Sequence, residues 1–215
     1  MTEVLELLVT WTPFLMGGFL SNIGVTILAV TIGTCIGAGL ARLRMHNSGA
    51  LASGSEFISR IFRNVPTLAI LFFAAFVLPR EFTIYGSDVV IEIPLWFKAA
   101  LGLSGSLIGF TSESLLIAHQ NLKRDDDSAA MLFVPTWGAS VMISFIASST
   151  ASLVGVSELI SRSNSIIAAT GTSHLIPVYL YCAVFFIVTC LLWVALIDRM
   201  KTSSILLSLL KRAAA

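Results

Sequence analysis

Residues 14–40 read FLMGGFLSNIGVTILAVTIGTCIGAGL and contain no charged side chain. About 20 consecutive apolar residues are enough for an α-helix to cross the hydrocarbon core of a bilayer. This stretch therefore predicts a transmembrane helix. Small residues let helices approach closely inside a membrane. We expect this helix to pack against other parts of the protein through the glycines at positions 17, 18, 24, 33, 37 and 39.

Four further stretches are long and apolar enough to span a bilayer, at residues 57–78, 94–118, 129–156 and 176–197. They are too long and too continuously apolar for the strands of a transmembrane barrel. A helix also satisfies its own backbone hydrogen bonds, as lipid requires. The prediction is an all-α membrane protein with five transmembrane helices, in which residues 1–215 form a single transmembrane domain.

The composition supports this class. The chain has 215 residues, of which 56% are hydrophobic and 12% charged, and its mean hydropathy is +0.92. Soluble domains usually carry about 25% charged residues. The formal net charge of +1 provides no basic field for a nucleic acid. We therefore expect lipid, and not nucleic acid, to surround or contact the chain.

The basic residues predict the orientation, because Lys and Arg concentrate on the cytoplasmic side of membrane proteins. Ten fall on one side of the five spans: Arg42, Arg44, Arg60, Arg63, Lys123, Arg124, Arg199, Lys201, Lys211 and Arg212. Three fall on the other: Arg80, Lys98 and Arg162. This distribution predicts an extracytoplasmic N-terminus and a cytoplasmic C-terminus. An odd number of spans also disfavours a two-fold internal repeat, so a pathway through the membrane would require a second subunit.

No catalytic or metal-binding pattern is visible. His46, His119 and His174 lack carboxylate or thiol partners at the spacing of a metal site or a catalytic triad. The sequence also has no glycine-rich loop with a lysine that could hold a nucleotide phosphate. We predict that the chain is not an enzyme, holds no metal and binds no cofactor itself.

The segment that runs from Arg63 through Pro66 to Phe73, RNVPTLAILFF, carries a family resemblance. It resembles the Arg-Gly-Thr-Pro-Leu-Leu-x-x-Leu-Phe segment of ABC importer permeases of the polar amino acid type, which take up histidine, glutamine, arginine or opines. Residues 22–28 and 39–44 are similar to the start and end of the first helix of that family. Gly155-Val-Ser-Glu158-Leu resembles its Gly-Val-x-Glu-Leu motif. Without the resemblance, Arg60 and Arg63 read as a cytoplasmic anchor before a helix.

The resemblance implies the binding-protein-dependent (MetI-like) permease architecture and a role in importing amino acids or similar small polar solutes. The implied partners are a second permease subunit, an ATP-binding subunit that carries the ATP and Mg²⁺, and an extracytoplasmic solute-binding protein. The implied location is the bacterial cytoplasmic (inner) membrane. Residues 161–173 are too polar to span it, and an outer surface helix beneath the binding protein would suit them.

Lys98, Glu113, Ser148, Ser149 and Thr150 are the candidates for a substrate path. Lys98 could attract a carboxylate or could simply extend to the membrane surface. Glu113 resembles the acidic residue of an Ala-Glu pair in the family and could pair with Arg60 or Arg63. The hydroxyls could line a polar path or bond to carbonyls of their own helix.

The connection after the third span departs from the family pattern. The family has a coupling loop containing Glu-Ala-Ala-x-x-x-Gly, which docks on the ATPase, whereas this chain has the turn-like run Lys123, Arg124, Asp125, Asp126 and Asp127. A shortened loop predicts weak coupling to an ATPase and favours a heterodimer whose other permease keeps its loop. Two alternatives remain open: a degenerate, non-coupling structural or regulatory partner, and an independent channel or secondary carrier.

Overall fold

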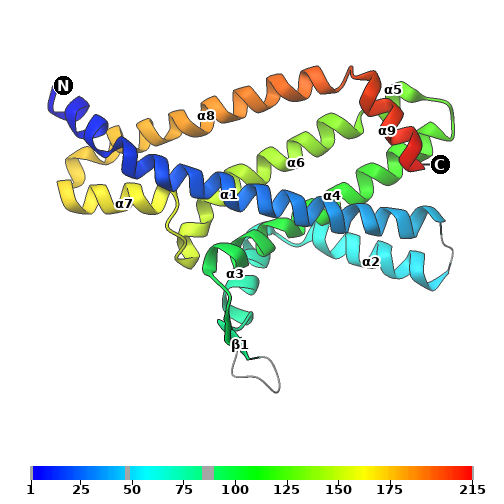
Figure 1. Cartoon of the computed structure of the whole chain (residues 1–215), viewed down its shortest axis with the longest axis horizontal. Coiled ribbons are helices and arrows are strands. Elements are labelled where there is room, and N and C mark those ends of the chain that lie inside the picture. The colour runs from blue at the N-terminus through cyan, green and yellow to red at the C-terminus, as the bar shows by residue number, and fades with distance from the viewer. Residues whose placement is uncertain (1, 47–48, 84–89, 215) are drawn as a thin grey trace.

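The structure, a computed structural model, describes residues 2–46, 49–83 and 90–214. Within them, four long helical segments run roughly along the longest axis of the molecule (Figure 1). These are α1 (Thr2–His46), α4 (Leu95–Leu122), α8 (Leu175–Met200) and a composite of α5 (Asp127–Ala130), α6 (Phe133–Ala147) and the 3-10 helix η1 (Ser148–Val154). By length and composition each of the four could cross a membrane. They correspond to the first, third, fifth and fourth predicted spans.

The second predicted span, residues 57–78, is not one straight helix. It is divided between α2 (Ala50–Asn64) and α3 (Thr67–Val77), whose axes differ in direction by 101°. Proline lacks a backbone N–H and disfavours the helical conformation in the residue before it. Val65 accordingly adopts an extended conformation with φ −79° and ψ 131°, and Pro66 becomes the N-cap of α3. The expectation of a continuous helix here was wrong, and α2 and α3 together form at most one broken span.

Helix α4 is the centre of the fold. Some 67% of its apolar stretch is buried within the chain, against 11% for α8, which leaves α8 to face lipid or a partner. Small residues make this burial possible, because they let backbones come close. A Cβ added to Gly102 would lie 2.5 Å from the Cα of Leu71 in α3, and one added to Gly109 would lie 2.7 Å from the backbone N of Arg63 in α2.

Some glycines of α1, but not all, likewise allow a close approach between helices. A Cβ on Gly33 would lie 2.5 Å from the Cβ of Leu107, and one on Gly37 would lie 2.8 Å from the carbonyl oxygen of Ile108, both in α4. A Cβ on Gly24 or Gly39 would have no neighbour within 4 Å. The predicted close packing of the first span is therefore present at Gly33 and Gly37, and absent at Gly24 and Gly39.

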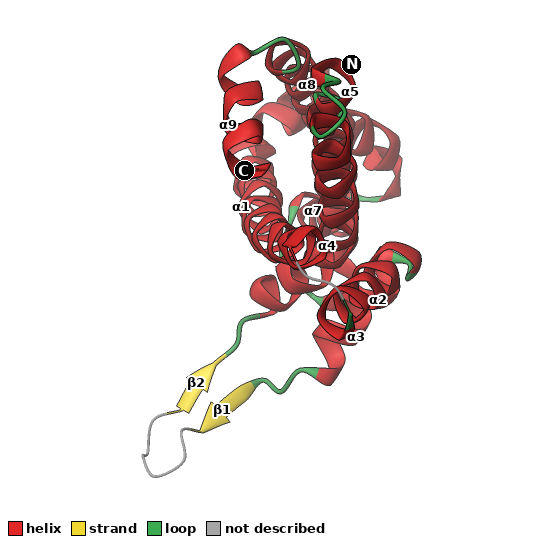
Figure 2. Cartoon of the chain, turned by 90° about the vertical axis from the view of Figure 1, so that its right-hand side faces the viewer, coloured by secondary structure: helices red, strands yellow, loops and turns green. Residues whose placement is uncertain are grey.

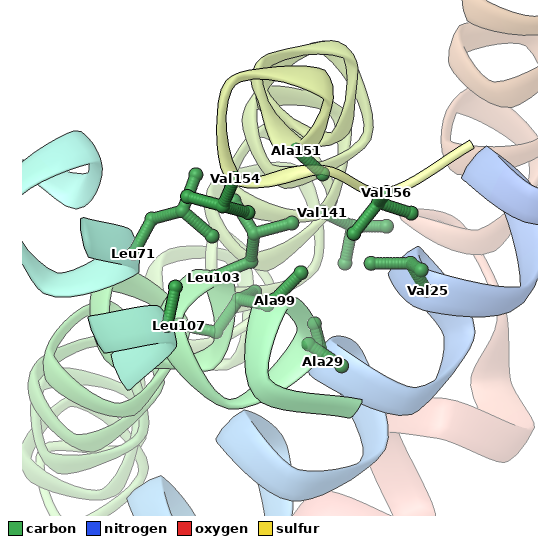
Figure 3. Packing of buried hydrophobic residues seen from close by; sticks show 12 residues of the cluster. Val25, Ala29, Leu71, Ala99, Leu103, Leu107, Val141, Ala151, Val154 and Val156 are labelled. Atoms are coloured by element: carbon green, nitrogen blue, oxygen red, sulfur yellow. The ribbon is translucent and has the colours of Figure 1, made fainter. Parts of the chain in front are cut away.

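Two hydrophobic clusters hold the helices together. The larger one joins α1, α3, α4, α6 and η1 (Figure 3) and includes Val25, Leu71, Leu103, Val141 and Val154. The smaller one packs α7 (Leu159–Thr170) and α8 against the N-terminal part of α1. Helix α7 lies near the N-terminus (Figure 1) and is the helix predicted from residues 161–173, although it begins and ends slightly earlier. A short 3-10 turn, η2 (Thr172–His174), connects it to α8.

Two elements were not predicted. A hairpin of β1 (Glu81–Thr83) and β2 (Val90–Glu92) follows α3, with Glu81 opposite Glu92, and it extends away from the helices (Figure 2). Helix α9 (Ser204–Ala214) follows α8 and folds back beside the end of α4 (Figure 1). The C-terminal ends of α1, α4 and α8, the start of α2, and α5 and α9 all lie at the same end of the molecule, which we call the basic end.

Candidate functional site

Three polar clusters connect the helices, and the first surrounds Glu158 near the end opposite the basic end. We call Asn22, Ser148 and Glu158 the Glu158 cluster; each is at most 1% exposed. The Asn22 amide nitrogen donates hydrogen bonds of 3.0 Å to Glu158 Oε2 and to Ser148 Oγ. The side-chain Oδ1 of Asn22 accepts a hydrogen bond of 3.0 Å from the backbone N–H of Leu159. One asparagine of α1 thus joins η1 to the start of α7.

The local sequence explains why a carboxylate lies here. Gly155 has φ 92°, a left-handed conformation that favours glycine, and it ends η1. Three residues later Glu158 is the N-cap of α7, and its carboxylate accepts bonds of 3.0 Å and 2.8 Å from the N–H groups of Ile160 and Ser161. An acceptor at this position satisfies N–H groups that the helix leaves unpaired. The Gly-Val-x-Glu-Leu motif therefore has a structural role as a helix stop and a helix start.

Burial raises the pKa of Glu158 above its ordinary value of 4.5, although the N–H groups of Ile160, Ser161 and Asn22 act in the opposite direction. The folded state thus binds this proton more tightly than the unfolded chain does. The contribution of Glu158 to stability is then largest below the ordinary pKa and is lost as the pH rises through the raised one.

We predict that the unfolding midpoint of the wild type falls, relative to that of Glu158→Gln, as the pH rises above 4.5. Comparing the two proteins at each pH cancels the titration of the other carboxylates. Thermal unfolding in detergent at a series of pH values measures the difference. A difference that is constant across the series, or that grows in favour of the wild type, contradicts the prediction.

The second cluster contains Glu113, near the basic end of α4. Its Oε2 lies 2.9 Å from Arg44 Nη1 of α1 and 3.2 Å from Arg63 Nη1 of α2. The expected pairing with Arg63 is present, whereas Arg60 pairs with Glu56 inside α2. Arg44 was not foreseen as a partner. With its side chain 31% exposed, Glu113 joins three helices, and its geometry is that of a structural junction.

We predict that Glu113→Gln lowers the free energy of unfolding by about 1–2 kcal/mol, because two arginines of a partly buried junction lose their counter-charge. Glu56→Gln is the matched control. It breaks an exposed pair within one helix, which contributes about 0.3–0.5 kcal/mol. Denaturation of both variants in the same detergent compares the two losses, and equal losses contradict the role of Glu113 as a junction.

The third polar contact is made by Lys98, which is 1% exposed. Its Nζ donates a hydrogen bond of 2.7 Å to the carbonyl oxygen of Leu78, the C-cap residue of α3. Cations are favourable at the C-terminal end of a helix. Because residues 98 and 113 lie about 22 Å apart along the axis of α4, Lys98 and Glu113 do not belong to one site.

The first three hydroxyls of η1 bond to carbonyl groups of the preceding turn, at the end of α6. Ser148, Ser149 and Thr150 donate to the carbonyl oxygens of residues 145, 146 and 147 at 2.6, 2.8 and 2.6 Å. This is the structural alternative considered from the sequence. Ser148 also accepts a bond from Asn22 and so belongs to the Glu158 cluster. The structure therefore does not bring the five substrate-path candidates together, and their part in transport remains a prediction.

The connection at the basic end is short and polar. Lys123 to Asp126 separate α4 from α5, and the Oδ1 of Asp126 caps α5 by accepting a bond of 2.9 Å from the N–H of Ala129. Asp125 has a left-handed φ of 59°. Asp127 forms an ion pair of 2.6 Å with Lys211 of α9, a partner that the sequence did not predict. Helix α9 is therefore joined by an ion pair to the last residue of the run in which the coupling function was sought.

Among the residues that the structure describes, no group of three or more His, Cys, Asp and Glu side chains could hold a metal ion. The polar clusters consist of hydrogen bonds and ion pairs between helices. Asn22 and Arg44 are the members that sequence reasoning missed. A polar residue inside an apolar span is costly unless it has a partner, and that signal was available for Asn22.

Comparison with known proteins identifies a fold. No protein-family model matches the sequence, and a search of curated proteins gives no match. A chain of the "Crystal structure of an amino acid ABC transporter with histidines" superposes with a TM-score of 0.75 and 18% sequence identity. The superposition covers 90% of this chain and 95% of that chain. The present chain thus has the fold of that transporter chain along nearly its whole length.

Proposed function

We propose that the chain is a transmembrane permease subunit of an ATP-driven importer of amino acids or similar small polar solutes. The observation that carries this proposal is the shared fold with a chain of an amino acid ABC transporter, over 90% of the residues. The helices long enough to span a membrane and the scattered permease motifs support it independently. In this proposal the chain catalyses no reaction, and ATP is hydrolysed in a separate subunit.

The proposed orientation places the basic end in the cytoplasm of a bacterial cell, because eight of the ten cytoplasmic cations gather there and Arg60 and Arg63 lie on the adjacent α2. The Glu158 cluster and α7 are then near the extracytoplasmic surface. A solute-binding protein would dock on this side, where α7 exposes Asn164 and Ser165.

The clusters suggest how such a subunit moves. Glu113 fastens α4 to α1 and α2, and Lys98 fastens it to the end of α3. Asn22 fastens α1 to η1 and α7. Helices joined in this way move as one body, so we assign Lys98, Glu113 and Glu158 to holding the permease rigid. Opening and closing would come from its rotation against a second permease.

The connection at the basic end favours a heterodimer. It consists of an exposed turn and the four-residue helix α5, and α9 is paired to it through Lys211. In this assembly the partner permease supplies the longer contact with the ATPase. The same observation supports a second candidate function, a non-coupling structural or regulatory subunit, because α5 is already paired with another part of this chain, through Asp127 and Lys211.

Purification of the tagged chain from its own host in mild detergent tests the proposal. Recovery of a second permease and an ATP-hydrolysing subunit, followed by amino acid uptake in proteoliposomes that requires ATP and not ADP, supports the importer. Uptake that is unchanged when this chain is omitted from the reconstituted complex supports the structural subunit instead. Recovery of the chain alone, with uptake driven by an ion gradient without ATP, overturns both in favour of a carrier.

A further inference from the structure

The break between α2 and α3 leaves polar groups of the backbone at the surface of the chain. Residues 63–66 are exposed, and Pro66 has no N–H to donate. Within the described part of the chain, no backbone hydrogen bond reaches the carbonyl oxygens of residues 62–65, and the N–H groups of Thr67 and Leu68 donate none. These groups therefore need partners from outside the two helices.

The break lies beside the midpoint of a helix that is long enough to cross a membrane. Gly109 is at the centre of α4, and a Cβ added to it would lie 2.7 Å from the backbone N of Arg63. One added to Gly105 would lie 2.7 Å from Ile70 Cδ1 and 3.2 Å from Phe62 Cδ1, on the two sides of the break. Irregular backbone at this depth faces protein or water and not lipid, because acyl chains offer no hydrogen bonds.

The surface next to the break is apolar and hollowed. A groove of about 330 Å³ is lined by Ile61, Phe62, Val65, Ala69, Ile70 and Phe73, which come from both sides of the break. On α3, Phe73 and Phe76 are 64% and 72% exposed. Helix α3 points away from the long helices (Figure 1), and the groove has no wall from them. An apolar surface of this kind is unfavourable in water and marks a contact with protein or lipid.

We propose that the second permease subunit packs on this corner of α2 and α3, with an apolar side chain in the groove and hydrogen-bonding side chains at the break. The inference rests on the proposed function, which supplies that subunit, and adds where the two permeases meet. Lipid would suit the groove alone and water the break alone. A protein surface suits both, because an interface combines an apolar centre with paired polar groups. Helix α8 is exposed but unbroken, so lipid suffices for it.

Photocrosslinking in the assembled complex, purified from its host and placed in lipid nanodiscs, tests where the subunits meet. Phe73→p-benzoylphenylalanine places the probe in the groove. Leu192→p-benzoylphenylalanine is the matched control on α8, since the two wild-type side chains are 64% and 67% exposed. We expect adducts with the second permease from position 73 and with lipid alone from position 192, identified by mass spectrometry. Lipid adducts alone from position 73, or permease adducts in equal yield from both positions, overturn the proposal.

Thiol labelling distinguishes a protein interface from a water-filled path. Asn64→Cys places a thiol at the break, and the wild type, which contains Cys35, Cys182 and Cys190, gives the background. With a membrane-impermeant maleimide, we expect no labelling of position 64 in the assembled complex and full labelling after the subunits are separated in detergent. Equal labelling in both states means that the break faces water, and it overturns the proposal.

A groove-filling variant tests the contact by affinity. Ala69→Trp fills the groove and should weaken retention of the second permease about tenfold, as extra volume in a packed contact does. Ala195→Trp, on the exposed side of α8, should leave retention unchanged. Both alanines are exposed, so the unfolding midpoint of the isolated chain should not fall in either variant. Retention by Ala69→Trp at the wild-type level overturns this inference alone, whereas a wild-type preparation without any second permease overturns the proposed function as well.

Discussion

Alanine in place of Gly37 lowers the free energy of unfolding by about 1–3 kcal/mol, the usual cost of forcing extra volume into a packed contact. The new Cβ would lie 2.8 Å from the carbonyl oxygen of Ile108, 2.8 Å from the Cβ of Thr111 and 3.2 Å from the backbone N of Ser112. Two of these three atoms belong to the backbone of α4, so no flexible side chain can move aside. The helices α1 and α4 must separate, and the larger hydrophobic cluster between them loses contacts.

Gly24→Ala is the matched control, because it lies on the same helix and its Cβ would meet no atom within 4 Å. Alanine is the better helix former by about 1 kcal/mol, so this variant should be as stable as the wild type or more stable. Thermal unfolding followed by tryptophan fluorescence suits the comparison, since Trp137 and Trp193 pack against that cluster. Equal changes at both glycines would exclude the close crossing of α1 and α4.

The glycines of α1 also show where the sequence prediction stops. Composition alone indicated that the span at residues 14–40 packs against protein, and Gly33 and Gly37 do so. Nothing in the pattern distinguished them from Gly24 and Gly39, because that depends on which face of α1 meets α4. The rotation of a helix is set by its neighbours, and a chain with apolar residues all round gives little signal for it.

The spans were predictable because length and hydropathy depend on local sequence. At residues 57–78 the apolar run continues past Pro66, so length and hydropathy did not separate α2 from α3. The signal for a break was present, since a proline restricts the residue before it, but prolines are also tolerated inside membrane helices. The 101° bend between α2 and α3 places the carbonyl oxygen of Leu78 within reach of Lys98. The partner of Lys98 could therefore not be predicted without first predicting the bend.

Some pairings between distant residues were expected from the sequence and others were not. A pairing of Glu113 with Arg60 or Arg63 was expected from the sequence, whereas the pairing with Arg44 requires the course of α1 beyond the predicted end of the span. Helix α9 was missed because it is short and amphipathic and follows the last apolar run. Its ion pair with Asp127 joins residues 84 positions apart, a contact that local sequence cannot specify.

Asn22→Ala has the other large expected effect, a loss of about 2–4 kcal/mol of unfolding free energy. The substitution removes the acceptor of the Leu159 N–H and the donor to Glu158 and Ser148, all in a region shielded from solvent. Buried polar groups left without partners cost about 1–3 kcal/mol each. Glu158→Ala is expected to be comparably harmful, because it removes the cap of α7 and leaves the Asn22 amide with one acceptor fewer.

The double variant distinguishes a network from two independent residues. If the Asn22–Glu158 bond contributes as the geometry indicates, the combined loss is smaller than the sum of the single losses by about 1–3 kcal/mol. Asn164→Ala, which removes an exposed asparagine of α7 bonded to Tyr179, is the control and should cost less than either. Additive losses would mean that the two residues act separately. Because the network is a buried polar link from α1 to η1 and α7, a coupling would also account for an asparagine in the middle of an apolar span.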